Sequence, residues 1–270
     1  MNRFPNPSLG RRQLLRNGGL ALSIGAIASA CGSGRTGGTD PGRLGVAEKV
    51  EAPQQPEIND VVLLRTAQSL EYTALAVYEA AGATGALSAD ETTLATRFVE
   101  DHTRHAALIG SLITDQGGAE FTCANPFVMN RTVGPILAAL EGTDDLHRDL
   151  LNIAHGFEAW AAASYQALVA ALSDLSLRTE TMRIGGEENR HAAALASVIN
   201  PAEIFSPALF GEPVDKDADG FPVPYAIPGV FGSLAGIELV VGARDAEGSR
   251  FSTQLQTPAQ NSLVYESLSC

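Results

Sequence analysis

The chain has 270 residues, of which 31 are acidic and 18 are lysine or arginine, and its formal net charge is −13. An acidic surface repels phosphate backbones, so this balance argues against nucleic acid as a partner. Hydrophobic residues make up 45% of the chain, which is too many for a disordered protein. After residue 31 no apolar run reaches the roughly 18 to 20 residues that span a bilayer, which excludes a polytopic membrane protein.

Residues 1–31 have the pattern of an export leader. The pair Arg11 and Arg12 precedes a short apolar stretch softened by glycine, which resembles a twin-arginine signal. The stretch ends in Ala-Ser-Ala-Cys at residues 28–31, which fits either cleavage after small residues or lipidation of Cys31. We predict export by the twin-arginine route to the periplasm or the outer face of the cell membrane. A lipid on Cys31 would be the protein's attachment to that membrane.

The next segments are a linker and a helical domain. Residues 32–56 are rich in glycine, proline and polar side chains, which predicts a flexible linker. Residues 57–200 have a helical hydrophobic pattern, and breaks rich in glycine or serine divide it into four segments. We predict long helices over residues 58–84, 88–116, 143–174 and 178–198. Ser88 followed by Glu91 predicts a capping box at the start of the second helix.

Residues 201–270 are predicted to form an extension rich in proline and glycine, with little regular structure. Short runs at residues 236–242 and 262–266 favour β-structure and could form a hairpin. In the same extension Asp215, Asp217 and Asp219 have the spacing that begins an EF-hand calcium loop. Position twelve of that loop is Ala226, where calcium needs a bidentate carboxylate, so we favour a solvated acidic turn over a calcium site.

Two further cysteines are Cys123, in the crossover between the second and third helices, and Cys270, the last residue of the chain. If lipid occupies Cys31, these two remain as a pair in an oxidising compartment. We therefore predict a disulfide between Cys123 and Cys270.

An internal repeat relates the first two helices to the last two. Residues 71–80 (EYTALAVYEA) align with residues 158–167 (EAWAAASYQA), and residues 101–108 (DHTRHAAL) align with residues 187–194 (EENRHAAA). The corresponding polar residues are Glu71 and Glu158, Tyr78 and Tyr165, Asp101 and Glu187, His102 and Glu188, Arg104 and Arg190, and His105 and His191. A helical hairpin used twice predicts an all-α four-helix bundle with a long crossover.

The acids and imidazoles of the repeat lie on apolar helix faces. Residues three, four and seven apart share a face, so Glu71 lies with Leu64, Ala67 and Leu75. An unpaired buried carboxylate costs several kcal/mol or stays protonated. Two bound cations at the centre of the bundle would remove this cost, so the pattern predicts a metal centre.

One glutamate from each of two helices, together with Glu188-x-x-His191, resembles the ferritin-like di-iron carboxylate proteins. Their bundles carry Glu, Glu-x-x-His, Glu, Glu-x-x-His in that order, and the likeness covers about residues 57–198. It implies a ferritin-like bundle that binds two iron ions, or alternatively two manganese ions. The ligands it implies are Glu71, His102, His105, Glu158, Glu188 and His191. It also implies that Tyr78 and Tyr165 donate hydrogen bonds to the carboxylate ligands.

The second helix departs from this pattern, because it has His102-x-x-His105 where the family has Glu-x-x-His. Four carboxylates neutralise two divalent ions, whereas three leave a charge of +1. Asp101 could supply the missing negative charge, so His102 and Asp101 are alternative candidates for one ligand position. If Asp101 is not a ligand, we expect it to support the ligands from outside the site. Glu187 is expected beside the site or on the surface, and Arg104 on a solvated helix face. The paired histidines could also favour a single ion or another metal.

Two functions from different classes follow, and the sequence leaves open whether the protein is an enzyme. One is a redox protein that oxidises Fe(II), disposes of peroxide or oxidises a small substrate. The other is a non-catalytic surface lipoprotein that uses the bundle as a scaffold for metal or for a partner. The linker and the extension argue against a storage cage of 24 subunits, and the sequence specifies no other oligomer.

Overall fold

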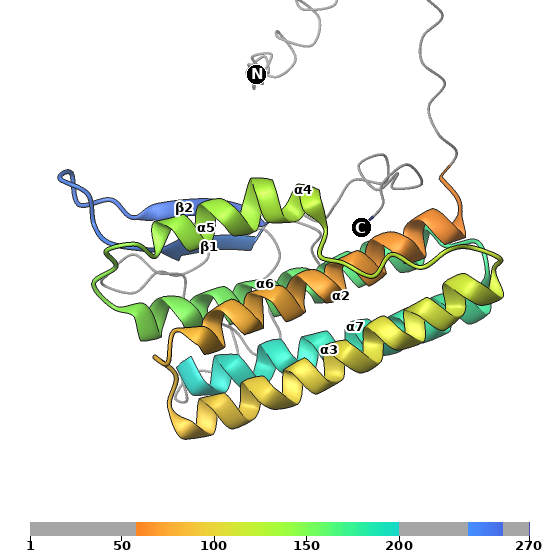
Figure 1. The fold of residues 1–270 in the computed structure, drawn as a ribbon, viewed down its shortest axis with the longest axis horizontal. Helices are drawn as coiled ribbons and strands as arrows, with labels where there is room; N and C mark the ends of the chain where they lie inside the picture. Colours follow the sequence, from red (N-terminus) through yellow and green to blue (C-terminus); the bar gives the residue numbers. More distant parts are fainter. Residues whose placement is uncertain (1–57, 200–236, 256–269) are drawn as a thin grey trace, which may run out of the picture. The chain divides into compact units, whose positions relative to one another are not determined.

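Four long helices form a bundle in the computed structural model, which describes residues 58–199, 237–255 and Cys270 (Figure 1). They are α2 (Asp60–Ala83), α3 (Ala89–Asp115), α6 (Leu146–Ala171) and α7 (Leu175–Ile199). Helix α2 packs against α3, helix α6 packs against α7, and the two hairpins meet through α2 with α6 and α3 with α7. The predicted all-α bundle with its duplicated hairpin is therefore confirmed, and each helix begins and ends within a few residues of its predicted bounds.

Local sequence signals explain where the helices begin. The Ser88 side chain accepts a hydrogen bond from the Glu91 backbone, and Glu91 accepts one from the Ser88 backbone, as the capping box predicts. Asn59 caps α2, and Asp145 caps α6 by accepting a hydrogen bond from the backbone of Arg148.

The crossover between α3 and α6 contains three short helical segments. They are α4 (Pro126–Val128), the π-helix η1 (Met129–Val133) and α5 (Gly134–Ala139). Before them in the chain, Cys123 forms a disulfide with Cys270, with 5.7 Å between the two Cα atoms. None of the described helices combines the length and the apolar character needed to cross a membrane.

The described part of the extension contains a short β-hairpin. Strands β1 (Ile237–Val241) and β2 (Phe251–Leu255) form an antiparallel hairpin in which Ile237 lies opposite Leu255. The hairpin packs against α6 at Gly156, where an added Cβ would lie 3.4 Å from Leu239 and 3.5 Å from Leu255. Strand β1 falls in the predicted run at residues 236–242. Strand β2 was missed, because only its last residue is buried and its apolar alternation is weak.

Several predictions fall outside the described residues. These are the leader with Cys31, the linker, the second β-leaning run and the acidic segment that contains Asp215, Asp217 and Asp219.

The core of the bundle has an apolar cluster on each side of its middle. One cluster includes Leu63, Ile109, Leu172 and Ile184, and the other consists of Tyr78, Phe98, Leu151 and Leu195. On every long helix the predicted metal ligands fall between the residues of these two clusters. The candidate site is therefore enclosed by apolar side chains at both ends.

Candidate metal centre

All six predicted ligands converge in the middle of the bundle, and each is at most 5% exposed. Glu71 comes from α2, and His102 and His105 come from α3. Glu158 comes from α6, and Glu188 and His191 come from α7. Their ligand atoms form two groups of four, and within each group all of these atoms lie within 4.8 Å of one another. Residues His102 and Glu188 belong to both groups.

The first group, which we call site A, contains Glu71, His102, His105 and Glu188. The Nδ1 atom of His102 lies 2.7 Å from Oε2 of Glu71. The Nδ1 atom of His105 lies 2.7 Å from Oε1 of Glu188 and 3.6 Å from Oε2 of Glu71. Nitrogen and oxygen atoms from three helices thus face one point.

The second group, site B, contains His102, Glu158, Glu188 and His191. The Nε2 atom of His102 lies 3.2 Å from Oε1 of Glu158. The Nδ1 atom of His191 lies 3.3 Å from Oε2 of Glu158 and 3.3 Å from Oε2 of Glu188. Glu188 therefore presents Oε1 to site A and Oε2 to site B.

Glu188 shows that these groups suit cations. Its side chain is fully buried, and within the described part of the chain neither carboxylate oxygen accepts a hydrogen bond of good geometry. The Nδ1 atom of His105 also lacks one. Burial, together with the negative charge of Glu71, raises the pKa of Glu188 above its ordinary value. A cation in each group would satisfy these atoms, and a set of three carboxylates and three imidazoles suits divalent transition metals.

Opposite charges stabilise the other side chains of the cluster. Although burial opposes ionisation, hydrogen bonds with His102 and His105 lower the pKa of Glu71 to about 2. Burial favours a neutral imidazole, but the carboxylates of Glu188 and Glu71 raise the pKa of His105 to about 10. Glu158 and Glu188 raise the pKa of His191 to about 9 in the same way. Without metal, these residues form a network of carboxylates and imidazoliums.

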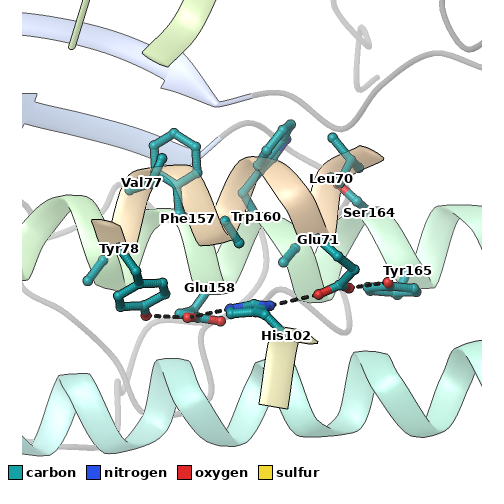
Figure 2. Close-up of a pocket in the computed structure, with 13 residues that line it drawn as sticks. Leu70, Glu71, Val77, Tyr78, His102, Phe157, Glu158, Trp160, Ser164 and Tyr165 are labelled. Carbon is teal, nitrogen blue, oxygen red and sulfur yellow. Dashed lines mark hydrogen bonds and ion pairs between the residues drawn. The ribbon is translucent and has the colours of Figure 1, made fainter. Parts of the chain in front are cut away.

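Two tyrosines donate hydrogen bonds to the carboxylates. Tyr165 donates a hydrogen bond to Oε1 of Glu71, and Tyr78 donates one to Oε1 of Glu158. Figure 2 shows the resulting chain, which runs from Tyr78 through Glu158, His102 and Glu71 to Tyr165. Each tyrosine therefore contacts the glutamate of the other helical hairpin rather than the glutamate seven residues before it.

A second pair of carboxylates lies behind the histidines. Asp101 contacts Nε2 of His191 at 3.2 Å, and Glu187 contacts Nε2 of His105 at 2.8 Å. Such carboxylates orient a histidine ligand and raise its basicity. The structure thus places Asp101 outside both ligand groups and brings His102 into both.

Arg104 links these two outer carboxylates, with contacts of 2.6 Å to Asp101 and 2.7 Å to Glu187. Its side chain is half-exposed, as expected for a solvated face. This link between the two helices was not predicted from the sequence. The repeat contained a signal for it. Asp101 and Glu187 are repeat partners, and each is followed three residues later on its own helix by an arginine.

Comparison with known proteins agrees with this geometry. No curated protein matched the chain. The family described as the ferritin-like domain matches residues 59–201, which is more than half of the chain and includes all six converging residues. The chain belongs to the ferritin-like domain family.

Proposed function

We propose that the protein binds two iron or manganese ions, one in site A and one in site B, and reacts with a small oxidant. The single observation that carries this proposal is the overlap of the two buried groups, which share Glu188 and His102. A carboxylate with one oxygen in each group is suited to bind both ions at once. Ions bound there would supply the electrons for the reduction of dioxygen or peroxide.

The residues around the sites hold the ligands in place. Tyr165 occupies Oε1 of Glu71, which leaves Oε2 turned toward His102. Tyr78 shares Oε1 of Glu158 with His102, and Oε2 of Glu158 faces His191. Asp101 contacts Nε2 of His191 and Glu187 contacts Nε2 of His105, so the Nδ1 atom of each histidine is left turned toward the ligand groups. This support reduces the reorganisation that metal binding requires.

The adjoining cavity favours a very small reactant. It has a volume of about 20 Å³ and lies between α2 and α6, where Glu71, His102 and Glu158 line one side (Figure 2). Much of the remaining lining is apolar and includes Phe157 and Trp160. A cavity of this size holds roughly one water-sized molecule, whereas pockets for organic ligands measure about 300–1,000 Å³. Dioxygen or hydrogen peroxide is therefore favoured over a larger substrate.

We further propose that the protein acts outside the cytoplasm, exported through the leader at Arg11 and Arg12 and attached to the membrane if Cys31 is lipidated. The disulfide between Cys123 and Cys270 supports this location, because such bonds persist in oxidising compartments. Cell fractionation of the wild-type chain and of a variant with both arginines changed to lysine tests the route. Mass spectrometry of the N-terminus tests the lipid.

Elemental analysis of the mature domain, purified without chelator, tests the metal centre. About two iron or manganese ions per chain, with consumption of peroxide or oxygen after reduction, would support the proposal. Two ions without turnover would favour the non-catalytic scaffold. No metal after anaerobic loading with Fe(II) or Mn(II) would refute both the metal centre and its chemistry.

Ligand variants connect the result to this site. Glu158→Gln and Glu188→Gln should each lower the metal content sharply. Glu180→Gln is the matched control, because Glu180 lies on α7 but pairs at the surface with Arg183. Unchanged metal content in both ligand variants would exclude sites A and B.

A further inference from the structure

His102 differs from the other histidines of the cluster in the use of its two nitrogens. His105 and His191 each turn Nδ1 toward the ligand groups and Nε2 toward an outer carboxylate. His102 instead turns Nδ1 toward Glu71 in site A and Nε2 toward Glu158 in site B. Figure 2 shows its ring between the two glutamates.

We propose that His102 bridges the two metal ions, with Nδ1 bound to the ion in site A and Nε2 bound to the ion in site B. This inference rests on the proposed function, because it requires both ions. Two nitrogen–metal bonds form, the N–H bonds at Nδ1 and Nε2 of the imidazolium break, and the two protons leave to solvent. The ring becomes an anionic imidazolate, and no oxidant or reductant takes part.

The charge of the cluster supports an imidazolate bridge. Glu71, Glu158 and Glu188 supply three negative charges against the four positive charges of two divalent ions. An imidazolate supplies the fourth negative charge. The bridge therefore removes the deficit that the His-x-x-His motif creates, and it does so without Asp101, which lies outside both groups.

Packing holds the ring in the bridging orientation. His102 is only 1% exposed, and three aromatic rings surround it. The ring centroid of Tyr78 lies 5.7 Å away, that of His191 5.6 Å away and that of His105 6.0 Å away. A close-packed interior of this kind resists rotation of the ring, so both nitrogens stay directed at the two sites.

The direct test is a crystal structure of the wild-type protein loaded with Zn²⁺, with the ions located by anomalous scattering. We expect two zinc ions per chain, each bound to one nitrogen of His102. Zinc–nitrogen bonds of about 2.0–2.1 Å on both sides of an imidazole place the ions roughly 6 Å apart. Two-metal sites without such a ring between the ions have separations of about 3.5–4 Å.

Calorimetric titration with Zn²⁺ provides a test in solution. In His102→Gln the affinity for both ions should fall, and for at least one of them the loss should be about 100-fold or more, beyond the 10- to 100-fold loss typical of a residue outside the ligand set. His102→Glu restores the carboxylate of the family pattern, so it should bind two ions at a separation of about 3.5–4 Å. His147→Gln is the matched control, since His147 is half-exposed and pairs with Glu91.

Two results would overturn the bridge. One is a wild-type structure with two zinc ions and one nitrogen of His102 unbound. The other is a folded His102→Gln protein, verified by its helical circular dichroism, that binds two ions as tightly as the wild type. If His102→Gln does not fold, the wild-type structure decides. A wild-type protein that binds neither zinc, Fe(II) nor Mn(II) is a different result, because it refutes the metal centre itself.

Discussion

The two outer carboxylates should each control one metal ion. Asp101 contacts His191, which belongs only to site B, and Glu187 contacts His105, which belongs only to site A. We therefore expect Asp101→Asn to weaken the ion in site B and Glu187→Gln to weaken the ion in site A. A titration of either variant should then show one unchanged and one weakened binding step.

The structure sets the size of these effects. Loss of a carboxylate behind a histidine ligand costs about 10- to 100-fold in metal affinity, or about 1.4–2.7 kcal/mol. Asp101 should lie near the upper value, because its side chain is 9% exposed whereas that of Glu187 is 30% exposed. Asp101 also pairs with Arg97 at the surface, and such pairs contribute only about 0–1 kcal/mol to folding. Arg97→Gln is therefore the control, since it removes this pair and spares the histidine.

Competition titrations with Zn²⁺ and a chelator, followed by a double-mutant cycle, measure the effect. Asp101→Asn should be strongly non-additive with His191→Ala, because the carboxylate acts through that imidazole, and nearly additive with His105→Ala. The reasoning is refuted if Asp101→Asn weakens both ions equally, or if its effect persists unchanged in the His191→Ala background.

Three further predictions concern stability. Gly185→Ala should destabilise the protein by about 1–3 kcal/mol in urea denaturation, because the new Cβ would lie 2.8 Å from Cβ of Tyr165. Gly186→Ala is the control and should cause no loss of stability, because the space around that residue is open. Cys123→Ser should cost about 3–5 kcal/mol, since the disulfide closes a loop of 147 residues, and reductant should have no further effect on that variant. The chelator-treated protein should lose stability as the pH rises from 6.5 to about 10. The reason is that His105 is protonated in the folded state and its pKa is raised to about 10. A urea denaturation midpoint that stays constant over this pH range would contradict that assignment.

The helices and the convergence of the ligands could be predicted from the sequence because both depend on regular spacing. Helical periodicity places residues three, four and seven apart on one face, and the repeat shows that two hairpins use equivalent faces. The choice between Asp101 and His102 could not be predicted in this way. These neighbours lie about 100° apart around the helix and both are buried, so a modest rotation of α3 decides which of them reaches the two ligand groups. That rotation depends on packing such as the stacking of Phe98 on His191, with 4.1 Å between ring centroids.

The hydrogen-bond partners of the two tyrosines also could not be predicted from the sequence. The repeat places Tyr78 near Glu71 on one helix face and Tyr165 near Glu158 on another. In the structure the hydroxyl groups cross between α2 and α6 to reach the opposite glutamates. Contacts between helices depend on how closely and at what angle the helices pack, and helical periodicity carries no information on either.

The repeat also explains why one substitution can alter the whole centre. Most equivalent residues contribute to one site each: Glu71 and His105 to site A, and Glu158 and His191 to site B. His102 and Glu188 are repeat partners that contribute to both sites, and they are also the pair of ligand positions at which the two halves differ. A change at a one-site ligand alters one ion, whereas a change at residue 102 alters the charge and the spacing of both ions together. We therefore expect His102, which stands where the second half of the repeat has Glu188, to influence the metal preference of both sites.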